Sequence, residues 1–128
     1  MRAPDYAEPL IGWRVWCVLE TQDGLRLASV IHDQVWEVDG KTVAHCEAGH
    51  SAPDETCTCG IHAAREPAPV LTYLRGRDEP RTVARVLGRV ALWGRVVEHE
   101  EGWRAEFAQP VDMARLIRAV RDRRAARV

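Results

Sequence analysis

Three of the four cysteines and one of the five histidines lie within residues 46–59. Their spacing is Cys46-x3-His50-x6-Cys57-x-Cys59, which supplies three thiolates and one imidazole. This ligand set is typical of a structural zinc site, in which four protein ligands surround the ion as a tetrahedron. Glycine and proline residues lie between or directly after the ligands and allow the chain to turn back around one ion. The sequence therefore predicts that zinc is bound by Cys46, His50, Cys57 and Cys59 in a metal loop, residues 46–60.

Other cofactors fit parts of this pattern. A [2Fe–2S] cluster held by three cysteines and one histidine is the main alternative. The CDGSH-type iron–sulfur proteins use this ligand set, but their histidine comes last, whereas His50 precedes Cys57. A catalytic deaminase zinc site is excluded because its cysteines are spaced Cys-x-x-Cys, unlike Cys57 and Cys59. Thiols without any metal are the remaining interpretation.

Two further histidines could replace His50 as the fourth ligand. His45 directly precedes Cys46, and adjacent side chains on a strand point to opposite faces, which favours His50. His62 is the weaker substitute. Cys17 lies in an apolar strand pattern and is interpreted as a thiol of the hydrophobic core.

Length and composition indicate one globular domain. A chain of 128 residues with 46% hydrophobic and 29% charged residues is typical of soluble proteins. No stretch approaches the roughly 20 apolar residues that span a bilayer, and the N-terminus has no apolar run typical of a secretory signal. We therefore expect no membrane association and a cytoplasmic location, where cysteines stay reduced and clustered cysteines more often bind metal.

Charge is unevenly distributed along the chain. Residues 112–128 contain six arginines and two aspartates, whereas the rest of the chain has a net charge of −5. An arginine-rich terminal helix makes nucleic-acid binding a second alternative function. The acidic remainder of the chain repels phosphate, so this alternative is not the preferred one.

Alternating hydrophobicity predicts strands at Trp13–Glu20, Leu25–His32, Val83–Glu98 and Trp103–Phe107. Shorter strands are predicted at 35–38 and 42–45, and a short helical turn at 61–66. Helical spacing predicts a C-terminal helix over residues 112–127. The predicted fold class is mainly β (α+β): a small antiparallel barrel or strongly bent sheet with a zinc loop and this helix.

The predicted domain organisation is an extended lead-in, residues 1–11, followed by a single β-rich domain, residues 12–128. Gly88 and Gly94 interrupt the longest predicted strand, and glycines in such positions commonly mark a bulge or bend. Five tryptophans are present. We expect Trp13, Trp93 and Trp103 in the core, and Trp16 and Trp36 on an outward face.

Two segments, Cys46 to Ile61 and Gly88-Arg-Val-Ala-Leu-Trp-Gly94, carry a resemblance. They resemble a set of small uncharacterised bacterial proteins with a Cys-…-His-x-Ala-Pro-…-Cys-x-Cys-Gly-Ile segment and a Gly-Arg-Val-x-Leu-Trp-Gly segment. The resemblance covers about residues 9–110 and implies no activity. Those proteins tend to have tyrosine where this chain has His62, which argues against His62 as a ligand.

The sequence contains no nucleophile–base pair, no phosphate-cradling loop and no open metal site. We therefore expect a zinc-stabilised small binding or adaptor protein without catalytic activity, with an unknown protein partner. An electron-transfer or redox-sensing [2Fe–2S] protein and a nucleic-acid-binding protein are the alternatives.

Overall fold

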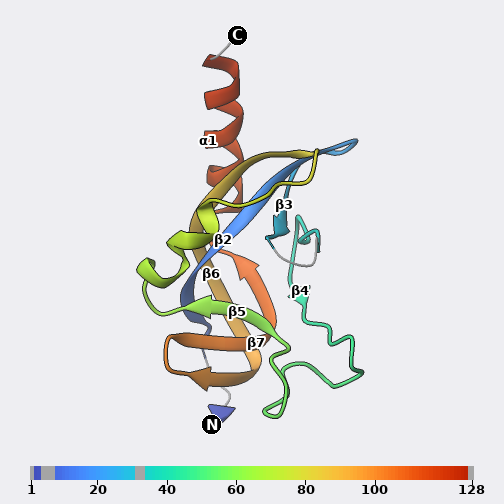
Figure 1. Ribbon diagram of the computed structural model, residues 1–128, viewed down its shortest axis with the longest axis vertical. Helices are drawn as coiled ribbons and strands as arrows, with labels where there is room; N and C mark the ends of the chain where they lie inside the picture. The colour runs from blue at the N-terminus through green and yellow to red at the C-terminus, as the bar shows by residue number, and fades with distance from the viewer. Residues whose placement is uncertain (1, 4–7, 31–33, 127–128) are drawn as a thin grey trace.

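The computed structural model describes residues 2–3, 8–30 and 34–126. These residues form one antiparallel sheet and two helical segments (Figure 1). The strands are β1 (Arg2–Ala3), β2 (Leu10–Thr21), β3 (Gly24–Ser29), β4 (Thr42–Val43), β5 (Ile61–Ala64), β6 (Thr82–His99) and β7 (Gly102–Pro110), and the helices are the 3-10 helix η1 (Ala68–Leu74) and α1 (Met113–Ala126). The prediction of a mainly β fold with a C-terminal helix is confirmed.

Four strands close into a ring. β2 pairs with β6, β6 with β7, β7 with β5, and β5 returns to β2. The last contact is a single residue pair, Trp13 opposite Ala64, so the ring is not a continuous barrel. β1 adds to β6, and β4 adds to the free edge of β7. Of the two architectures expected from sequence, the strongly bent sheet is the closer description.

The bend is concentrated in β6, which is 18 residues long. Its first part pairs with β2 and its last part with β7, and the register with β7 shifts between Trp93 and Val96. Gly94 lies at this shift with a φ of 79°, a conformation that costs little only for glycine. The predicted bulge at Gly94 is confirmed, and it turns β6 from one wall of the ring to the next.

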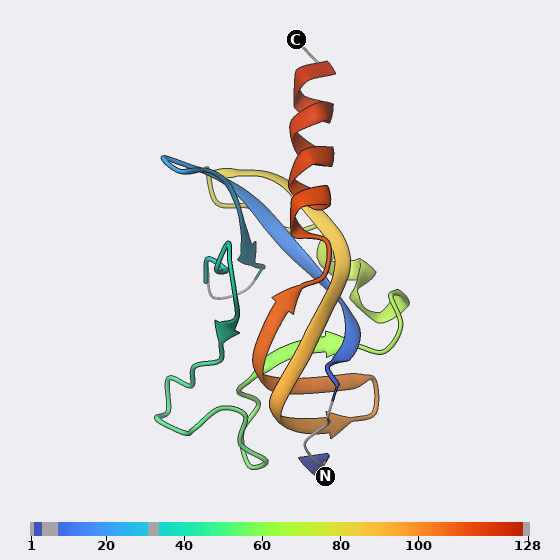
Figure 2. The same ribbon diagram turned by 180° about the vertical axis from the view of Figure 1, so that it is seen from behind.

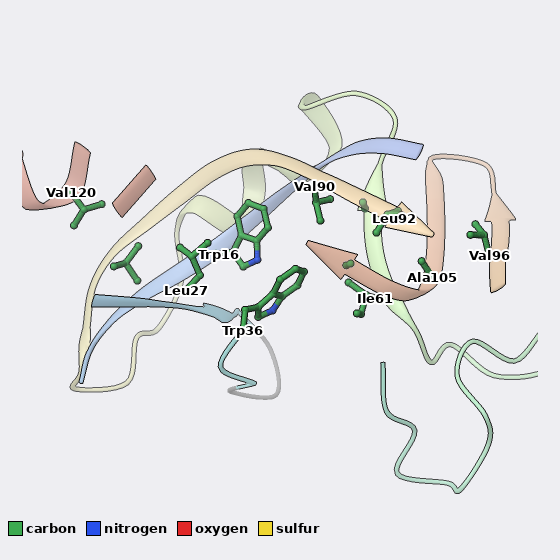
Figure 3. Close-up of a cluster of buried hydrophobic side chains, with 12 residues drawn as sticks. Trp16, Leu27, Trp36, Ile61, Val90, Leu92, Val96, Ala105 and Val120 are labelled. Carbon is green, nitrogen blue, oxygen red and sulfur yellow. The ribbon is translucent and has the colours of Figure 1, made fainter. Parts of the chain in front are cut away.

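The core prediction for the tryptophans was wrong. Trp16 and Trp36 are fully buried, and their rings meet edge to face with centroids 5.3 Å apart (Figure 3). Trp13, Trp93 and Trp103, which were expected inside, are only partly buried. Trp16 is buried because β2 is covered on both faces, so its alternating pattern has no solvent-facing side. Trp36 lies outside the strands and packs against Trp16 in the main cluster.

The second face of β2 carries its own small apolar cluster. Cys17 and Leu19 pack there against Ala28 of β3, and all three are buried. The prediction that Cys17 is a core thiol is therefore confirmed. The main cluster, which contains Trp16 and Trp36, lies on the opposite face.

Helix α1 is seated on the body by its first turns. Leu116 and Ile117 pack on the main cluster, and Val120 is buried within it. At Gly88 of β6 a side chain would meet Leu116, since a Cβ there would lie 2.8 Å from its Cδ1. The later turns of α1 project away from the sheet (Figures 1 and 2). Among the described residues, no helix combines the length and apolar character needed to cross a membrane.

Three local predictions differ from the structure. Residues 61–64 form strand β5 instead of a helical turn, because Ile61 and Ala63 point into the core while β5 pairs with β7. The strand expected at 35–38 is reduced to one bridge between Val35 and Ala28. The lead-in predicted for residues 1–11 contains β1 and the start of β2; its residues 1 and 4–7, like His32, lie outside the described residues.

The tryptophan arrangement makes a direct prediction. Trp16→Ala should lower the free energy of unfolding by about 3–5 kcal/mol, since it removes a fully buried indole from a packed core. Trp93→Ala serves as the matched control, because Trp93 is only partly buried against Phe107. Urea denaturation of the metal-loaded variants measures both. An equal loss, or a larger loss for Trp93→Ala, would contradict the observed core.

Candidate metal centre

The metal loop belongs to a long connection without regular structure. Residues 44–60 join β4 to β5 and run along the outside of the ring (Figure 2). Within this connection the structure brings together all four residues predicted as ligands. One ligand atom from each of Cys46, His50, Cys57 and Cys59 lies within 4.8 Å of the other three. These four residues could hold a metal ion.

Two distances in the cluster can be compared with an ideal tetrahedral site. The Sγ atoms of Cys46 and Cys57 are 3.8 Å apart, and Cys46 Sγ is 3.6 Å from His50 Nδ1. Metal–sulfur bonds of about 2.3 Å and metal–nitrogen bonds of about 2.0–2.1 Å give tetrahedral edges of about 3.8 Å and about 3.6 Å. These two distances therefore match the edges of one tetrahedral coordination sphere, and the remaining ligand atoms lie within 4.8 Å.

Two tight turns place the ligands. The Gly49 N–H donates to the Cys46 carbonyl at 3.0 Å, which closes the turn that brings His50 back to Cys46. The Cys57 N–H donates to the Asp54 carbonyl at 3.1 Å, and the Asp54 carboxylate accepts the Thr56 N–H at 2.8 Å. Hydrogen bonds from Thr56 also lower the pKa of Asp54. Short-range hydrogen bonds therefore set the positions of Cys46, His50 and Cys57.

Arg104 of β7 attaches the loop to the sheet. This side chain is buried, and its Nη1 donates to the carbonyls of Cys59 at 2.6 Å and Asp54 at 3.1 Å. Gly60 packs directly beside it with a φ of 118°, and a Cβ at this position would lie 3.0 Å from Arg104 Cβ. The role of Arg104 could not be predicted from the sequence. Alternation along β7 places this residue on the polar face, and one sequence does not distinguish a solvated arginine from one that binds loop carbonyls.

The electrostatics of the cluster favour a cation. The backbone N–H groups of His50 and Ala48, together with hydrogen bonds from the neighbouring thiols, lower the pKa of Cys46 to about 7. Burial raises the pKa of Cys59, and the nearby thiols of Cys46 and Cys57 raise it further. Three thiolates this close repel one another, so full deprotonation requires a positive ion among them.

The two histidines considered as substitutes for His50, His45 and His62, do not belong to the cluster. His45 is exposed and does not belong to the four-residue cluster. His62 lies on β5, where its Nε2 makes a 2.8 Å hydrogen bond with the Thr58 carbonyl. A carbonyl only accepts, so Nε2 of His62 carries the proton. His62 thus supports the loop between Cys57 and Cys59 and does not replace His50 in the cluster.

A cavity of about 830 Å³ opens beside the metal loop. Its walls are formed by the middle of β2, by β5, by the loop segment that carries Cys57 and Cys59, and by η1. The lining is mainly apolar and aromatic, including Trp13, Val70 and Tyr73. This volume and lining are typical of pockets that bind small molecules or side chains.

Comparison with known proteins identifies no family for this chain. No protein-family description, curated protein sequence or solved structure matches the chain. The function must therefore be argued from the metal cluster, the cavity and the charges around them.

The ligand assignment can be tested with cobalt(II), whose absorption reports tetrahedral thiolate coordination. The protein should bind one cobalt ion per chain with intense visible bands. His50→Ala and Cys59→Ser should each lower the affinity by more than about 100-fold, since a ligand contributes more than the outer-sphere groups that account for 10–100-fold.

Two variants serve as controls for this titration. Cys17→Ala removes a core thiol, and His45→Ala removes the histidine next to Cys46; both should keep the stoichiometry and the spectrum. Loss of the bands in His45→Ala with retention in His50→Ala would reassign the fourth ligand.

Proposed function

We propose that this protein is a zinc-stabilised binding or adaptor protein in which the metal is structural. Cys46, His50, Cys57 and Cys59 would hold the zinc ion. The observation that carries the proposal is the cluster itself: its four ligand atoms lie within 4.8 Å of one another, and two of the distances between them match the edges of a zinc tetrahedron. With four protein ligands the ion has no open position for a substrate or an activated water.

The compactness of the cluster supports zinc over the [2Fe–2S] alternative. Ligands divided between two irons lie farther apart than the edge of one tetrahedron, whereas these four lie within 4.8 Å of one another. Three thiolates with one imidazole in a tetrahedral arrangement are also typical of zinc. An electron-transfer or redox-sensing function is therefore not proposed.

The role of the zinc would be to fix the connection between β4 and β5. This connection spans residues 44–60, and structureless connections longer than about 12–15 residues are uncommon in compact domains unless they have a function. A metal bound by its two halves would hold the loop in one shape. That loop also forms a wall of the cavity.

Exposed apolar side chains around the cavity support a binding function. Leu71 and Tyr73 of η1 are 46% and 43% exposed, and Val43 of the edge strand β4 is 39% exposed. Apolar side chains exposed near a pocket are typical of interaction sites. We propose that this face binds a partner protein, with the zinc loop as its scaffold.

The proposal predicts one zinc per chain in protein purified without added metal, measured by elemental analysis. Removal of the zinc with a chelator should lower the free energy of unfolding by several kcal/mol, since metal binding in such sites is worth about 10–16 kcal/mol. Far-UV circular dichroism should keep its β signal, because the core of β2, β6 and β7 does not involve the loop. Hydrogen exchange should rise mainly in residues 44–64.

Two results would contradict this assignment. Iron with visible absorption in the purified protein would favour the [2Fe–2S] cluster. Unchanged stability and unchanged exchange after complete zinc removal would mean that the metal has no structural role.

The nucleic-acid alternative depends on the projecting end of α1. Arg118, Arg121 and Arg123 are exposed toward this end, and Arg115 is exposed in the first turn, but Arg124 pairs with Glu20 at 3.2 Å. Such a helix would bind phosphates without sequence preference and with a steep salt dependence. The net charge of −5 on the rest of the chain opposes this binding.

We therefore expect no mobility shift of duplex or single-stranded oligonucleotides with the zinc-loaded protein, even at low salt. A shift that disappears when Arg118 and Arg121 are both replaced by glutamine, and persists when Arg77 and Arg89 are replaced instead, would establish the alternative function.

A further inference from the structure

The cavity beside the metal loop lies at a gap in the sheet. β3 and β5 both pair with the same edge of β2. The pairing with β5 ends at Trp13 of β2, and the pairing with β3 starts at Trp16 of β2. Arg14 and Val15 therefore have no strand partner on this edge, among the residues that the structure describes. Both line the cavity. The gap exposes a short stretch of β2 at the cavity floor.

The side chain of Arg14 bridges this gap. Its Nη1 donates to the carbonyl of His62 on β5 at 2.7 Å, and its Nη2 donates to Ser29 Oγ of β3 at 3.1 Å. The guanidinium also lies over the Trp36 ring, 5.0 Å from its centroid. These contacts fix the position of the group, and all of them are with uncharged partners.

Arg14 has no ion-pair partner in the described part of the chain. No carboxylate there pairs with it, and its Nε is enclosed without a hydrogen-bond partner. Burial lowers the pKa of Arg14 to about 10, an effect opposed by nearby Tyr73. The guanidinium is therefore still charged at neutral pH. A partly buried cation that is hydrogen-bonded only to neutral groups favours an anionic ligand.

Ser29 adds a second donor at the same place. Its Oγ accepts hydrogen bonds from Arg14 and from Trp36 Nε1, the latter at 2.9 Å. Both lone pairs of the hydroxyl are then used, which leaves its O–H to donate. Ser29 is buried and lines the cavity. The floor of the gap therefore presents donors, from Arg14 and Ser29, in an apolar and aromatic surround.

We propose that this cavity is a binding site for a carboxylate attached to an apolar group, with Arg14 and Ser29 as its anion-binding residues. The carboxylate would come either from a free organic acid or from the C-terminus of a peptide. This inference rests on the proposed binding function and names the chemistry that the site recognises. The apolar walls around Trp13 and Val70 would contact the body of the ligand.

A single negative charge suits the site better than a phosphate dianion. Glu47 and Glu101 also line the cavity, and both are exposed. Solvent screens these two carboxylates at the mouth, but they still disfavour a second negative charge inside. The single positive charge of Arg14 is balanced by the single negative charge of one carboxylate.

The test uses the zinc-loaded full chain and neutral analogues of each probe. Naphthylacetate and naphthylacetamide form one pair, and an acetylated tetrapeptide ending in valine, with a free or an amidated C-terminus, forms the other. Nuclear magnetic resonance titrations follow the Arg14 Nε–H signal and the amide signals of Ser29 and β5. In at least one pair, the acid should bind at least about tenfold more tightly than its amide, since a charge-assisted hydrogen bond is replaced by a neutral one.

Variants assign this preference to Arg14. In Arg14→Gln the preference for the acid should fall below about twofold, whereas Arg14→Lys should retain part of it. Arg89→Gln, which changes an exposed arginine of β6 outside the cavity, should keep the full preference. If Arg14→Gln does not fold, the wild-type comparison and Arg14→Lys still decide the question.

One acidic residue near the site in sequence lies outside the described residues. Asp33 precedes Gln34, which lines the cavity, so Asp33→Asn is titrated in parallel. Unchanged preference in Asp33→Asn supports the proposal. Binding that appears only in Asp33→Asn would show that the chain supplies its own counterion, and would overturn it.

The two probe pairs distinguish the sources of the carboxylate. Preference in the naphthyl pair alone indicates a small organic acid, and preference in the peptide pair alone indicates a C-terminus. Equal affinity of acid and amide in both pairs would overturn the proposal. Because zinc content is measured on the same samples, this failure would leave the structural zinc intact and would differ from failure of the proposed function.

Discussion

The repulsion among three thiolates in one loop is the physical constraint that governs the shape of the metal loop and of the cavity wall that it forms. Cys46, Cys57 and Cys59 approach one another closely enough to surround a single ion. Hydrogen bonds within local turns, and those that Arg104 donates to the carbonyls of Asp54 and Cys59, hold them there. Such a cluster is stable only when a cation neutralises it or when the thiols keep their protons. The geometry of residues 44–60 is therefore linked to metal binding.

The metal loop lies beside the cavity, so its shape affects the proposed binding site. β5 is only four residues long and contacts β2 at one pair, so it cannot cover the edge of β2 alone. The gap that remains between β5 and β3 becomes the floor of the cavity, and the loop becomes one of its walls. Metal binding and binding of the proposed ligand would therefore be coupled through β5, because the loop continues directly into that strand.

The sequence contained enough information for the class of the fold and for the candidate ligands. Periodicity located β2, β6, β7 and α1, since each is long enough for its pattern to be clear, and Gly94 marked the bulge. The ligands could be predicted because Cys46, His50, Cys57 and Cys59 are close in sequence. The burial of Trp16 could not be predicted, because it depends on β2 being covered on both faces. The burial of Trp36 could not be predicted either, because Trp36 lies outside the strands and is enclosed by tertiary contacts such as that with Trp16. The strand at 61–64 was missed because its pairing with β7 is a tertiary contact that overrides local preference.

The residues that sequence reasoning missed share one property. The alternating patterns of β2 and β7 predict that Arg14 and Arg104 face solvent. Both side chains instead donate to carbonyls of distant segments. Their roles depend on which strand ends lie next to each other, and a single sequence does not contain that information. The gap beside Arg14 exists only because β3 and β5 share one edge of β2.

We propose that one zinc ion is enclosed by three sulfurs and one nitrogen of the same loop. X-ray absorption at the zinc edge of the protein as purified measures this directly. We expect a four-coordinate ion with sulfur neighbours at about 2.3 Å, one nitrogen at about 2.0–2.1 Å, and no water. An oxygen-rich or more than four-coordinate shell, or a second metal as neighbour, would contradict it.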